Sequence, residues 1–166
     1  DTPLVLTTTT PTGSARVRDL FGDSVIHVYV PYDLPGAVRR FLRRFRPRLA
    51  VIMETELWPN LFAACHDRGV PLLVANARLS PRSARGYAKV RALIRSTLSH
   101  VTMLAAQGEP DGRRFRILGL PAERLQVTGS IKFEQRLPAS LREQAEVLRG
   151  MLGRDRPVWI AASTHE

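Results

Sequence analysis

Cysteine and lysine are nearly absent from this chain of 166 residues. Its one cysteine, Cys65, cannot form a disulfide within the chain, and its place in a predicted helix beside Phe62 and Ala64 indicates a small core residue. Only two of the 25 basic residues are lysines, Lys89 and Lys132, so the other 23 are arginines. No apolar run approaches the roughly 20 residues that a membrane-spanning helix requires.

Sequence motifs for metal binding and for nucleotide phosphates are missing as well. The histidines are scattered and form no cluster with Cys65, so no spacing typical of a metal site is present. There is no Walker-type phosphate loop and no GxGxxG fingerprint. We therefore expect neither a metal nor a bound cofactor.

The charge is strongly one-sided, with a formal net charge of +10 at pH 7. Arginine favours bidentate contacts with phosphate and carboxylate, so nucleic acid, an anionic membrane and a phosphorylated substrate are all compatible partners. A general coding bias toward arginine is the plainer explanation for part of this excess. Because aromatic residues do not interleave with the basic ones as stacking platforms, we do not expect a nucleic-acid partner.

Apolar runs of strand length alternate along the chain with amphipathic stretches of helical length. The predicted strands are 4–8, 25–30, 49–53, 72–75, 101–105, 125–128 and 158–162. The predicted helices are 14–21, 34–44, 57–68, 81–98, 110–118 and 137–152. This alternation indicates βαβ units, and hence an α/β fold with a mainly parallel, Rossmann-like sheet.

The domain organisation follows from Pro138, which lies after the predicted strand 125–128 and well before the next one, 158–162. We interpret residues 131–137 as a linker between a domain at 1–130 and the start of a second α/β domain at 138–166. The chain does not begin with Met and stops directly after a predicted strand, so we expect it to be part of a longer protein.

Two carboxylates, Glu54 and Glu56, follow the predicted strand 49–53. Ligands of open α/β sheets bind beyond the carboxyl ends of the strands, which makes this pair a candidate catalytic site. The alternative is that Glu56 supports the next helix through its dipole while Glu54 is merely solvated.

Polar residues also follow the neighbouring strand 72–75. Asn76 and Arg78 lie at the same predicted edge, where Arg78 could clamp a carboxylate or a phosphate, or pair with one of the glutamates. On the next predicted helix, Arg82, Arg85 and Lys89 are spaced by three and four residues and share one face. That face could meet lipid phosphates or only water.

Three further segments each follow a predicted strand. In the first, Thr9, Thr10 and Ser14 could hold an anionic or sugar group at a helix N-terminus, although Ser14 could simply be the helix N-cap. In the second, Ser130 and Lys132 form either part of a binding edge or a turn with an exposed lysine. The third segment consists of Ser163, Thr164, His165 and Glu166, before what should be another helix.

Several of these segments recur together in one known family. In chain order they are TTTTPTGS (7–14), YVPYDLP (29–35), METELWPN (53–60), ANARLS (75–80), RSARGY (82–87), AQ (106–107), TGSIKF (128–133) and ASTHE (162–166). Their combination resembles the bacterial 3-deoxy-D-manno-octulosonic acid (Kdo) transferases. Glu134 stands where the family usually has Asp, a change that conserves the charge.

The resemblance implies a GT-B architecture, in which two Rossmann-like domains face each other across a cleft. It implies transfer of Kdo from CMP-Kdo to a lipid A precursor at the cytoplasmic face of the bacterial inner membrane, by a protein that is peripheral or anchored by a segment outside this chain. The family's main candidate base lies in a Gly-Glu segment upstream of residue 1, so we expect these residues alone to be inactive.

The resemblance also assigns roles to the candidate residues. Glu54 and Glu56 would be catalytic. The acceptor would contact Thr9, Thr10, Ser14, Asn76 and Arg78. The donor would contact Ser130, Lys132, Ser163, Thr164, His165 and Glu166. The anionic membrane surface would face Arg82, Arg85 and Lys89.

Two other functions stay open at this point. A basic α/β module that binds RNA or DNA is favoured by the net charge. A different GT-B enzyme acting on nucleotide sugars, such as an epimerase, would share the fold, but the METELWPN and ANARLS segments argue against it.

Overall fold

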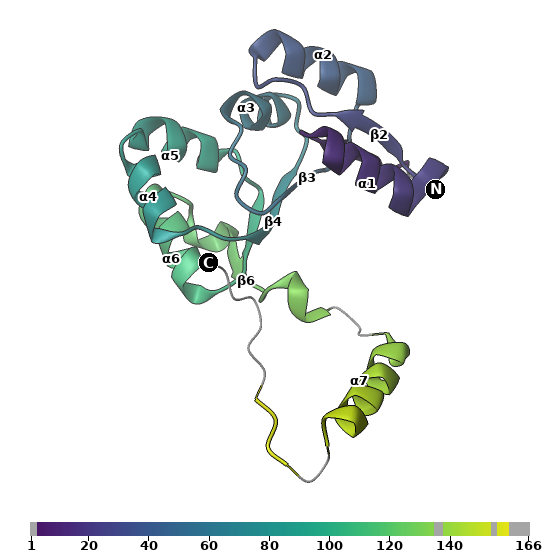
Figure 1. The fold of residues 1–166 in the computed structure, drawn as a ribbon. Coiled ribbons are helices and arrows are strands. Elements are labelled where there is room, and N and C mark those ends of the chain that lie inside the picture. The colour runs from purple at the N-terminus through teal and green to yellow at the C-terminus, as the bar shows by residue number, and fades with distance from the viewer. Residues whose placement is uncertain (1–2, 135–137, 154–155, 160–166) are drawn as a thin grey trace. The chain divides into compact units, whose positions relative to one another are not determined.

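The computed structural model of the protein describes residues 3–134, 138–153 and 156–159 (Figure 1). The chain divides into two compact units, Asp1–Ile131 and Lys132–Glu166. Each unit is described by itself below.

The first unit alternates strands with helices along its whole length. Its strands are β1 (Val5–Thr8), β2 (Ile26–Tyr29), β3 (Ala50–Met53), β4 (Leu72–Ala77), β5 (Met103–Ala106) and β6 (Leu125–Val127). Its helices are α1 (Pro11–Phe21), α2 (Pro35–Phe45), α3 (Pro59–Asp67), α4 (Pro81–Ala88), α5 (Arg91–Ser99) and α6 (Glu109–Leu118). Short 3₁₀ turns occur at η1 (Gly22–Ser24) and η2 (Ala122–Arg124), and a third, η3 (Ile131–Glu134), spans the division between the two units.

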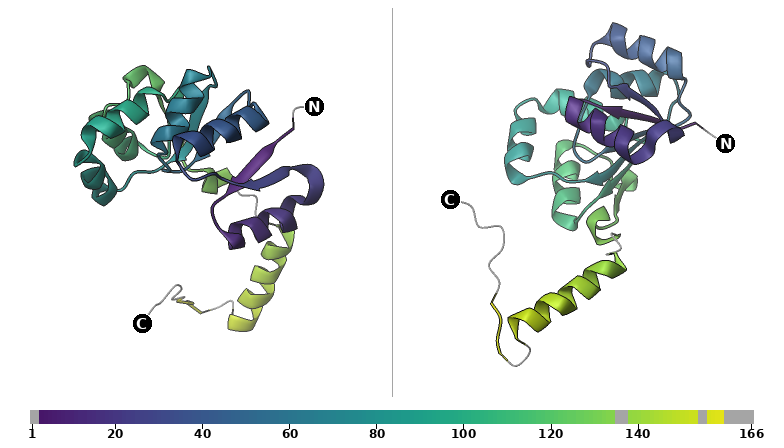
Figure 2. Two further views of the ribbon diagram at one scale, coloured as in Figure 1. Left: turned by 90° about the horizontal axis from the view of Figure 1, so that it is seen from above. Right: turned by 45° about the vertical axis from the view of Figure 1, so that its right-hand side comes forward.

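All strand pairs in the described residues are parallel, which confirms the predicted α/β class. The strands do not form a single sheet, however. β1 pairs only with β2, and β3 to β6 form a separate sheet in the order β3-β4-β5-β6. Helix α1 lies on one side of the strands, whereas α2 and α3 lie together on the other (Figure 2).

The core lies on one face of the four-stranded sheet. Alternate residues of β4 and β5, such as Leu72, Val74 and Leu104, are fully buried beneath α3, α5 and α6. Cys65 of α3 belongs to this core, as the sequence predicts, and its burial raises the pKa of the thiol to about 11. Residues that point to the opposite face of β4 and β5 are only half buried, among them Leu73.

Proline and hydroxyl caps define where the helices begin. Helices α1 to α4 each have proline in their first turn, where its missing N–H costs no hydrogen bond. Ser80 caps α4 by accepting a hydrogen bond from the Ser83 backbone N–H. In α2 the arginines 39, 40, 43 and 44 are exposed and Leu42 is buried, as predicted for an amphipathic helix.

Two predicted helix boundaries are wrong. The expected single helix at 81–98 is two helices, because Val90 leaves the helical region (φ −119°, ψ 42°) and its carbonyl starts α5 by accepting from Ile94 N–H. Gly86 and the β-branched Val90 both weaken helix formation there. The first helix begins at Pro11 rather than Ser14, because Thr10 is its N-cap.

The second unit contains one described helix, α7 (Ala139–Leu152). Its apolar residues Leu141, Val147, Leu148 and Met151 are all exposed. Val158 and Trp159 are not in a strand, contrary to expectation, and residues 160–162 of that predicted strand lie outside the described residues.

Candidate functional site

Two strained residues are neighbours near the carboxyl ends of β3 and β4. Glu54 directly follows β3, and Asn76 is the last but one residue of β4, where the pairing with β5 shifts register. Glu54 has φ 62° and Asn76 has φ 53°, in the left-handed region that non-glycine residues rarely adopt. Because Met53 pairs with Ala75, the next residues, Glu54 and Asn76, are neighbours across the two strands. Such strain costs roughly 1–3 kcal/mol per residue and clusters at functional sites, so this pair marks the carboxyl edge of the sheet as the candidate site.

The surroundings of Asn76 hold this strained turn in place. Its side-chain Oδ1 accepts from the Ile131 backbone N–H at 3.2 Å, and its backbone oxygen accepts from Gln107 Nε2 at 3.0 Å. The side chain is only 8% exposed. Asn76 therefore joins the ends of β4 and β5 to the segment after β6, and its amide oxygen is already engaged by the protein.

Glu54, unlike Asn76, has an exposed side chain on a fixed backbone. Its backbone N–H is fixed to the Ala75 oxygen at 2.8 Å, while its side chain is exposed. Within the described residues its carboxylate forms neither a hydrogen bond nor an ion pair. The backbone is thus constrained and the acidic group is available to solvent or to a ligand.

Glu56 is exposed too, and its Oε2 accepts a hydrogen bond from Trp58 Nε1 at 3.2 Å. The carboxylate that hydrogen-bonds to the N-terminus of α3 is that of Asp33 rather than that of Glu56. Asp33 Oδ1 accepts from Leu61 N–H at 2.8 Å, and its Oδ2 accepts from Asn60 N–H at 3.0 Å. A carboxylate from the loop after β2 therefore caps the helix that follows β3.

Arg78 stands two residues beyond Asn76. Its backbone N–H donates to Thr55 Oγ1 at 3.2 Å, which ties the loop after β4 to the loop after β3. The expected alternative, a salt bridge from Arg78 to Glu54 or Glu56, is wrong, because in the described part of the chain Arg78 forms no ion pair with either glutamate. Arg78 is exposed at the same edge as the two glutamates.

The loop after β4 is clamped a second time from α6. Asp111 Oδ1 accepts from Leu79 N–H at 2.8 Å, and Arg114 donates to the Leu79 oxygen at 2.9 Å. Sequence reasoning missed Asp33, Asp111 and Gln107. Asp33 lies within the YVPYDLP segment and Gln107 within the AQ pair, so their place in these segments was the only sign in the sequence that they matter. Their hydrogen-bond partners are at least 27 residues away in the chain, so no local pattern links them.

At the carboxyl end of β1, Thr10 is a helix cap. Its Oγ1 accepts from Gly13 N–H at 3.1 Å, and a Cβ added at Gly13 would come within 3.1 Å of that same oxygen. Thr9 is exposed, whereas Ser14 is only 3% exposed and lies inside α1. The alternative role of Ser14 as N-cap is therefore wrong, and of these three residues Thr9 and Thr10 present their side chains to solvent.

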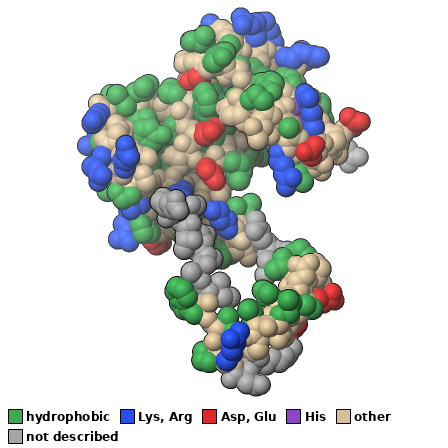
Figure 3. All heavy atoms as spheres, viewed as in Figure 1, with side chains coloured by type: hydrophobic (Ala, Val, Ile, Leu, Met, Phe, Trp, Pro, Cys, Tyr) green, Lys and Arg blue, Asp and Glu red, His purple; other side chains and the backbone are tan. Residues whose placement is uncertain are grey.

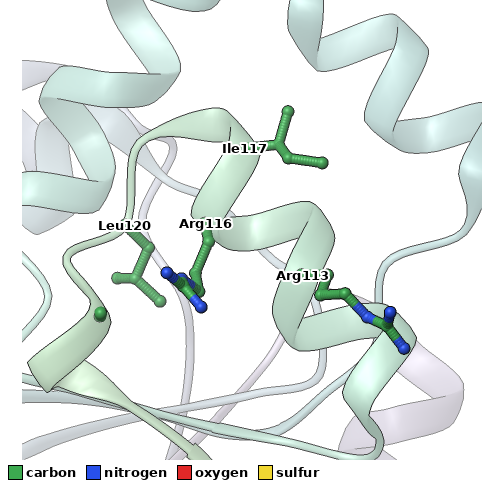
Figure 4. A pocket seen from close by; sticks show the side chains of 5 residues that line it. Arg113, Arg116, Ile117 and Leu120 are labelled. Carbon is green, nitrogen blue, oxygen red and sulfur yellow. The ribbon is translucent and has the colours of Figure 1, made fainter.

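The basic face on α4 exists as the spacing predicts: Arg82, Arg85 and Lys89 are all exposed. Basic side chains gather over α4 and α5 in Figure 3, and the exposed apolar residues Val90 and Leu93 lie in the same stretch. A shallow hollow lies on the outer side of α6 and the segment that follows it, where Arg113, Arg116 and Ile117 of the helix and Leu120 line it (Figure 4). Among the described helices none combines the length and apolarity needed to cross a bilayer.

The expected donor-side residues are separated by the division of the chain. Ser130 is half buried in the first unit, and Lys132 is exposed on η3 in the second. Ser163, Thr164, His165 and Glu166 lie outside the described residues. No group of three or more His, Cys, Asp or Glu side chains in the described part of the chain could hold a metal ion.

Comparisons with known proteins agree on one family. Residues 1–135 match the family model described as "3-Deoxy-D-manno-octulosonic-acid transferase (kdotransferase)". The chain is 46% identical over 162 residues to a 3-deoxy-D-manno-octulosonic acid transferase of Haemophilus influenzae, covering 98% of this chain and 38% of that protein. It is 40% identical over 169 residues to a protein of the same name from Bordetella pertussis, covering 99% and 39%. The chain thus spans about two fifths of these relatives.

Among solved structures, UDP-GlcNAc 2-epimerase from Neisseria meningitidis has a similar fold. The TM-score is 0.55 at 14% identity, and the match covers 91% of this chain and 46% of that one. The Staphylococcus aureus MnaA–UDP complex gives a TM-score of 0.51 at 10% identity, covering 88% and 50%. At these identities the likeness concerns the fold alone, which is of the GT-B type.

Proposed function

The chain belongs to the 3-deoxy-D-manno-octulosonic-acid (Kdo) transferase family, and from this premise we propose that it forms part of an enzyme that transfers Kdo from CMP-Kdo to a lipid A precursor. The observation in this chain that best supports the proposal is the carboxyl edge of the sheet at Glu54 and Asn76, where both residues have left-handed backbone. It combines strained backbone, exposed carboxylates and an exposed arginine beyond the carboxyl ends of parallel strands, where α/β proteins bind their ligands.

In the proposed reaction an acceptor hydroxyl attacks the anomeric carbon of Kdo. A base removes the hydroxyl proton, the new glycosidic bond forms, and the bond to the CMP phosphate breaks on the opposite face, which inverts the anomeric configuration. Cationic side chains and helix N-termini would stabilise the departing phosphate. Glu54 and Glu56 would assist at the acceptor, either by accepting the proton or by orienting the hydroxyl; the exposed carboxylate of Glu54 supports this role.

The remaining edge residues would shape the acceptor site. Thr9, Thr10 and Arg78 offer exposed polar groups, of which the Arg78 guanidinium suits a phosphate on the acceptor. Asn76 would act as a positioning residue, since its amide oxygen holds Ile131 and its side chain is nearly buried. Ser14 would contribute through the packing of α1.

The donor would be bound mainly by the second domain, which begins at residue 138, after the linker. We propose that residues 1–130 form most of the acceptor domain, with a linker at 131–137. Lys132, Ser130 and the segment 163–166 would contact CMP-Kdo.

The test uses the full-length enzyme and measures CMP release from CMP-Kdo with a lipid A precursor. Glu54→Gln and Glu56→Gln should each lower the rate by about 10²-fold, the usual effect of losing an acid–base or positioning group. Glu123→Gln is the matched control, because Glu123 is an exposed glutamate on η2. If both edge variants fold and retain the control's rate, the carboxylates have no catalytic role.

We also propose that the α4 face binds the anionic cytoplasmic surface of the inner membrane. Arg82, Arg85 and Lys89 supply positive charge beside the exposed Val90 and Leu93, the combination that favours interfacial binding.

Sedimentation of the full-length protein with anionic vesicles tests the membrane proposal. Replacing Arg82, Arg85 and Lys89 by Gln should weaken binding far more than replacing three exposed arginines of α2, at 39, 40 and 43. An equal loss in both triple variants would mean that only net charge matters, and tighter binding to RNA than to vesicles would favour the nucleic-acid alternative.

A further inference from the structure

Arg78 lies between two peptide groups that the protein holds by hydrogen bonds. Its own N–H donates to Thr55 Oγ1 at 3.2 Å, and the N–H of the next residue, Leu79, donates to Asp111 Oδ1 at 2.8 Å. A change in either backbone dihedral of Arg78 would turn one N–H away from its partner, since these dihedrals set the angle between the two peptide planes. The backbone of Arg78 is therefore fixed on both sides of its Cα, although its side chain is exposed.

The contacts that hold Leu79 form a closed ring with two residues of α6. Asp111 Oδ1 accepts from the Leu79 N–H and, at 3.3 Å, from Arg114 Nη1. The same Arg114 nitrogen donates to the Leu79 oxygen at 2.9 Å. The side chains of Asp111 and Arg114 are only 18% and 27% exposed. One half-buried ion pair thus binds both backbone polar groups of Leu79, with charge-assisted hydrogen bonds that are stronger than neutral ones.

The side chain of Leu79 anchors the same short loop in the core. It is fully buried, whereas Arg78 before it is exposed and Ser80 after it caps α4. Helices α4 and α6 lie side by side, so a pair of residues on α6 reaches the loop that leads into α4 (Figure 1). The loop after β4 is therefore held by its core side chain, by α6 and by the loop after β3.

A fixed backbone matters for an exposed arginine that binds an anion. The guanidinium binds phosphate through N–H donors in a planar fork, and this bidentate contact requires a defined direction of approach. When the backbone is already ordered, binding of the ligand costs only the freedom of the side chain. Contacts that order the backbone of Arg78 before the ligand arrives therefore increase its affinity for a phosphate.

We infer that Asp111 and Arg114 are positioning residues for the acceptor: through Leu79 they fix the backbone from which Arg78 binds a phosphate group of the lipid A precursor. The inference rests on the proposed function, because it takes Arg78 as an acceptor-binding residue. It adds two residues of α6 to those that determine acceptor affinity, and both act through Arg78 without touching the ligand. Their effect on affinity should therefore depend on Arg78 and on the phosphate.

Calorimetric titration of the full-length protein with a lipid A precursor in detergent, without CMP-Kdo, tests the inference and needs no transfer reaction. Arg78→Gln should weaken binding about tenfold or more, because it removes a charged donor. Asp111→Ala should weaken it about fivefold to tenfold through loss of preorganisation. Asp111→Asn keeps an oxygen that can accept from the Leu79 N–H, and should restore most of the lost affinity. Glu109→Ala is the matched control, because Glu109 is an exposed glutamate in the first turn of the same helix.

A double variant separates positioning from a general disturbance of the fold. If Asp111 acts through Arg78, adding Asp111→Ala to Arg78→Gln should change the affinity by less than about twofold. A precursor from which the phosphates have been removed should bind equally to wild type and to Asp111→Ala. Additive effects of the two substitutions, or an equal weakening with the dephosphorylated precursor, would mean that Asp111 only supports the fold, and the inference would be overturned.

Arg114→Met provides a second variant where Asp111→Ala does not fold. It removes the hydrogen bond to the Leu79 oxygen but leaves the one from Leu79 to Asp111, and should weaken precursor binding about twofold to fivefold. Unchanged affinity in both α6 variants, or a wild-type protein that does not bind the precursor, would also overturn the inference. Transfer is measured separately as CMP release, so a protein that shows this binding pattern without transferring Kdo would contradict the proposed function alone.

Discussion

Asp33 should contribute more to stability than any other exposed or half-exposed carboxylate in the first unit. Its two oxygens accept from the backbone N–H groups of Asn60 and Leu61 at 3.0 and 2.8 Å. Its backbone oxygen also accepts from Asn60 Nδ2 at 2.7 Å. One residue therefore satisfies two N–H groups at the start of α3 and ties the β1–β2 sheet to the larger sheet.

The magnitude follows from these contacts. A hydrogen bond to a charged group contributes roughly 1.5–3 kcal/mol, and loss of a helix cap costs about 0.5–2 kcal/mol. Because Asp33 is half buried, water replaces part of the loss, and we expect Asp33→Ala to cost about 2–4 kcal/mol. Asp33→Asn keeps one acceptor oxygen and should cost roughly half as much. Against a usual total of about 5–15 kcal/mol, either loss is large.

Urea unfolding of the full-length protein, followed by circular dichroism at pH 7, measures both variants. Asp23→Ala is the control, because Asp23 is an exposed aspartate on η1. The expected order of stability is wild type and Asp23→Ala, then Asp33→Asn, then Asp33→Ala. If Asp33→Ala costs no more than Asp23→Ala, the cap from the loop after β2 does not hold α3 in solution.

Two further predictions concern a glycine and a histidine. Gly119→Ala should destabilise the full-length protein by about 1–3 kcal/mol in urea, because Gly119 has φ 113° and a Cβ there would lie 2.7 Å from Arg95 Cγ. Gly86→Ala, with open space around it, should be neutral or stabilising, and equal costs at both glycines would refute the steric argument. Burial is the main cause that lowers the pKa of His100, and the neighbouring His66 lowers it further. The unfolded chain therefore binds the proton at a higher pH than the folded protein does. The stability that depends on neutral His100 should be fully present above about pH 6.5 and be lost as the pH falls below it. His100→Gln should flatten this pH dependence of the unfolding midpoint, and parallel curves for variant and wild type would exclude His100 as its source.

The fold class could be predicted from the sequence because it depends on local patterns. Apolar runs and turn residues located β3 to within one residue and β4 at its start. The break at Val90 could not be predicted, since Gly86 and a β-branched residue occur in many continuous helices. The division into two sheets was equally hidden, because it depends on which strands meet and not on the strands themselves.

The candidate site was predictable in its positions and not in its geometry. Glu54 and Asn76 each follow a predicted strand, and parallel pairing places both at one edge. Their left-handed backbones, however, are accompanied by hydrogen bonds to residues far along the chain. The hydrogen bond from Ile131 to Asn76 spans 55 positions, and no local pattern encodes such a distance. Asp33 escaped notice for the same reason, since its partners lie 27 and 28 positions away.

Substitutions at the neighbouring residues Glu54 and Asn76 should differ in how much they disturb the structure. This difference decides how mutational data at the edge can be interpreted. The Glu54 side chain is exposed and unpartnered among the described residues, so Glu54→Gln changes charge without removing a described contact. The Asn76 side chain is 8% exposed and accepts the Ile131 N–H, so replacing it removes a hydrogen bond that supports the left-handed backbone. An intramolecular hydrogen bond contributes roughly 0.5–1.5 kcal/mol. A loss of activity at Glu54 with unchanged stability therefore reports on chemistry, whereas a loss at Asn76 reports first on the shape of the turn that presents Glu54.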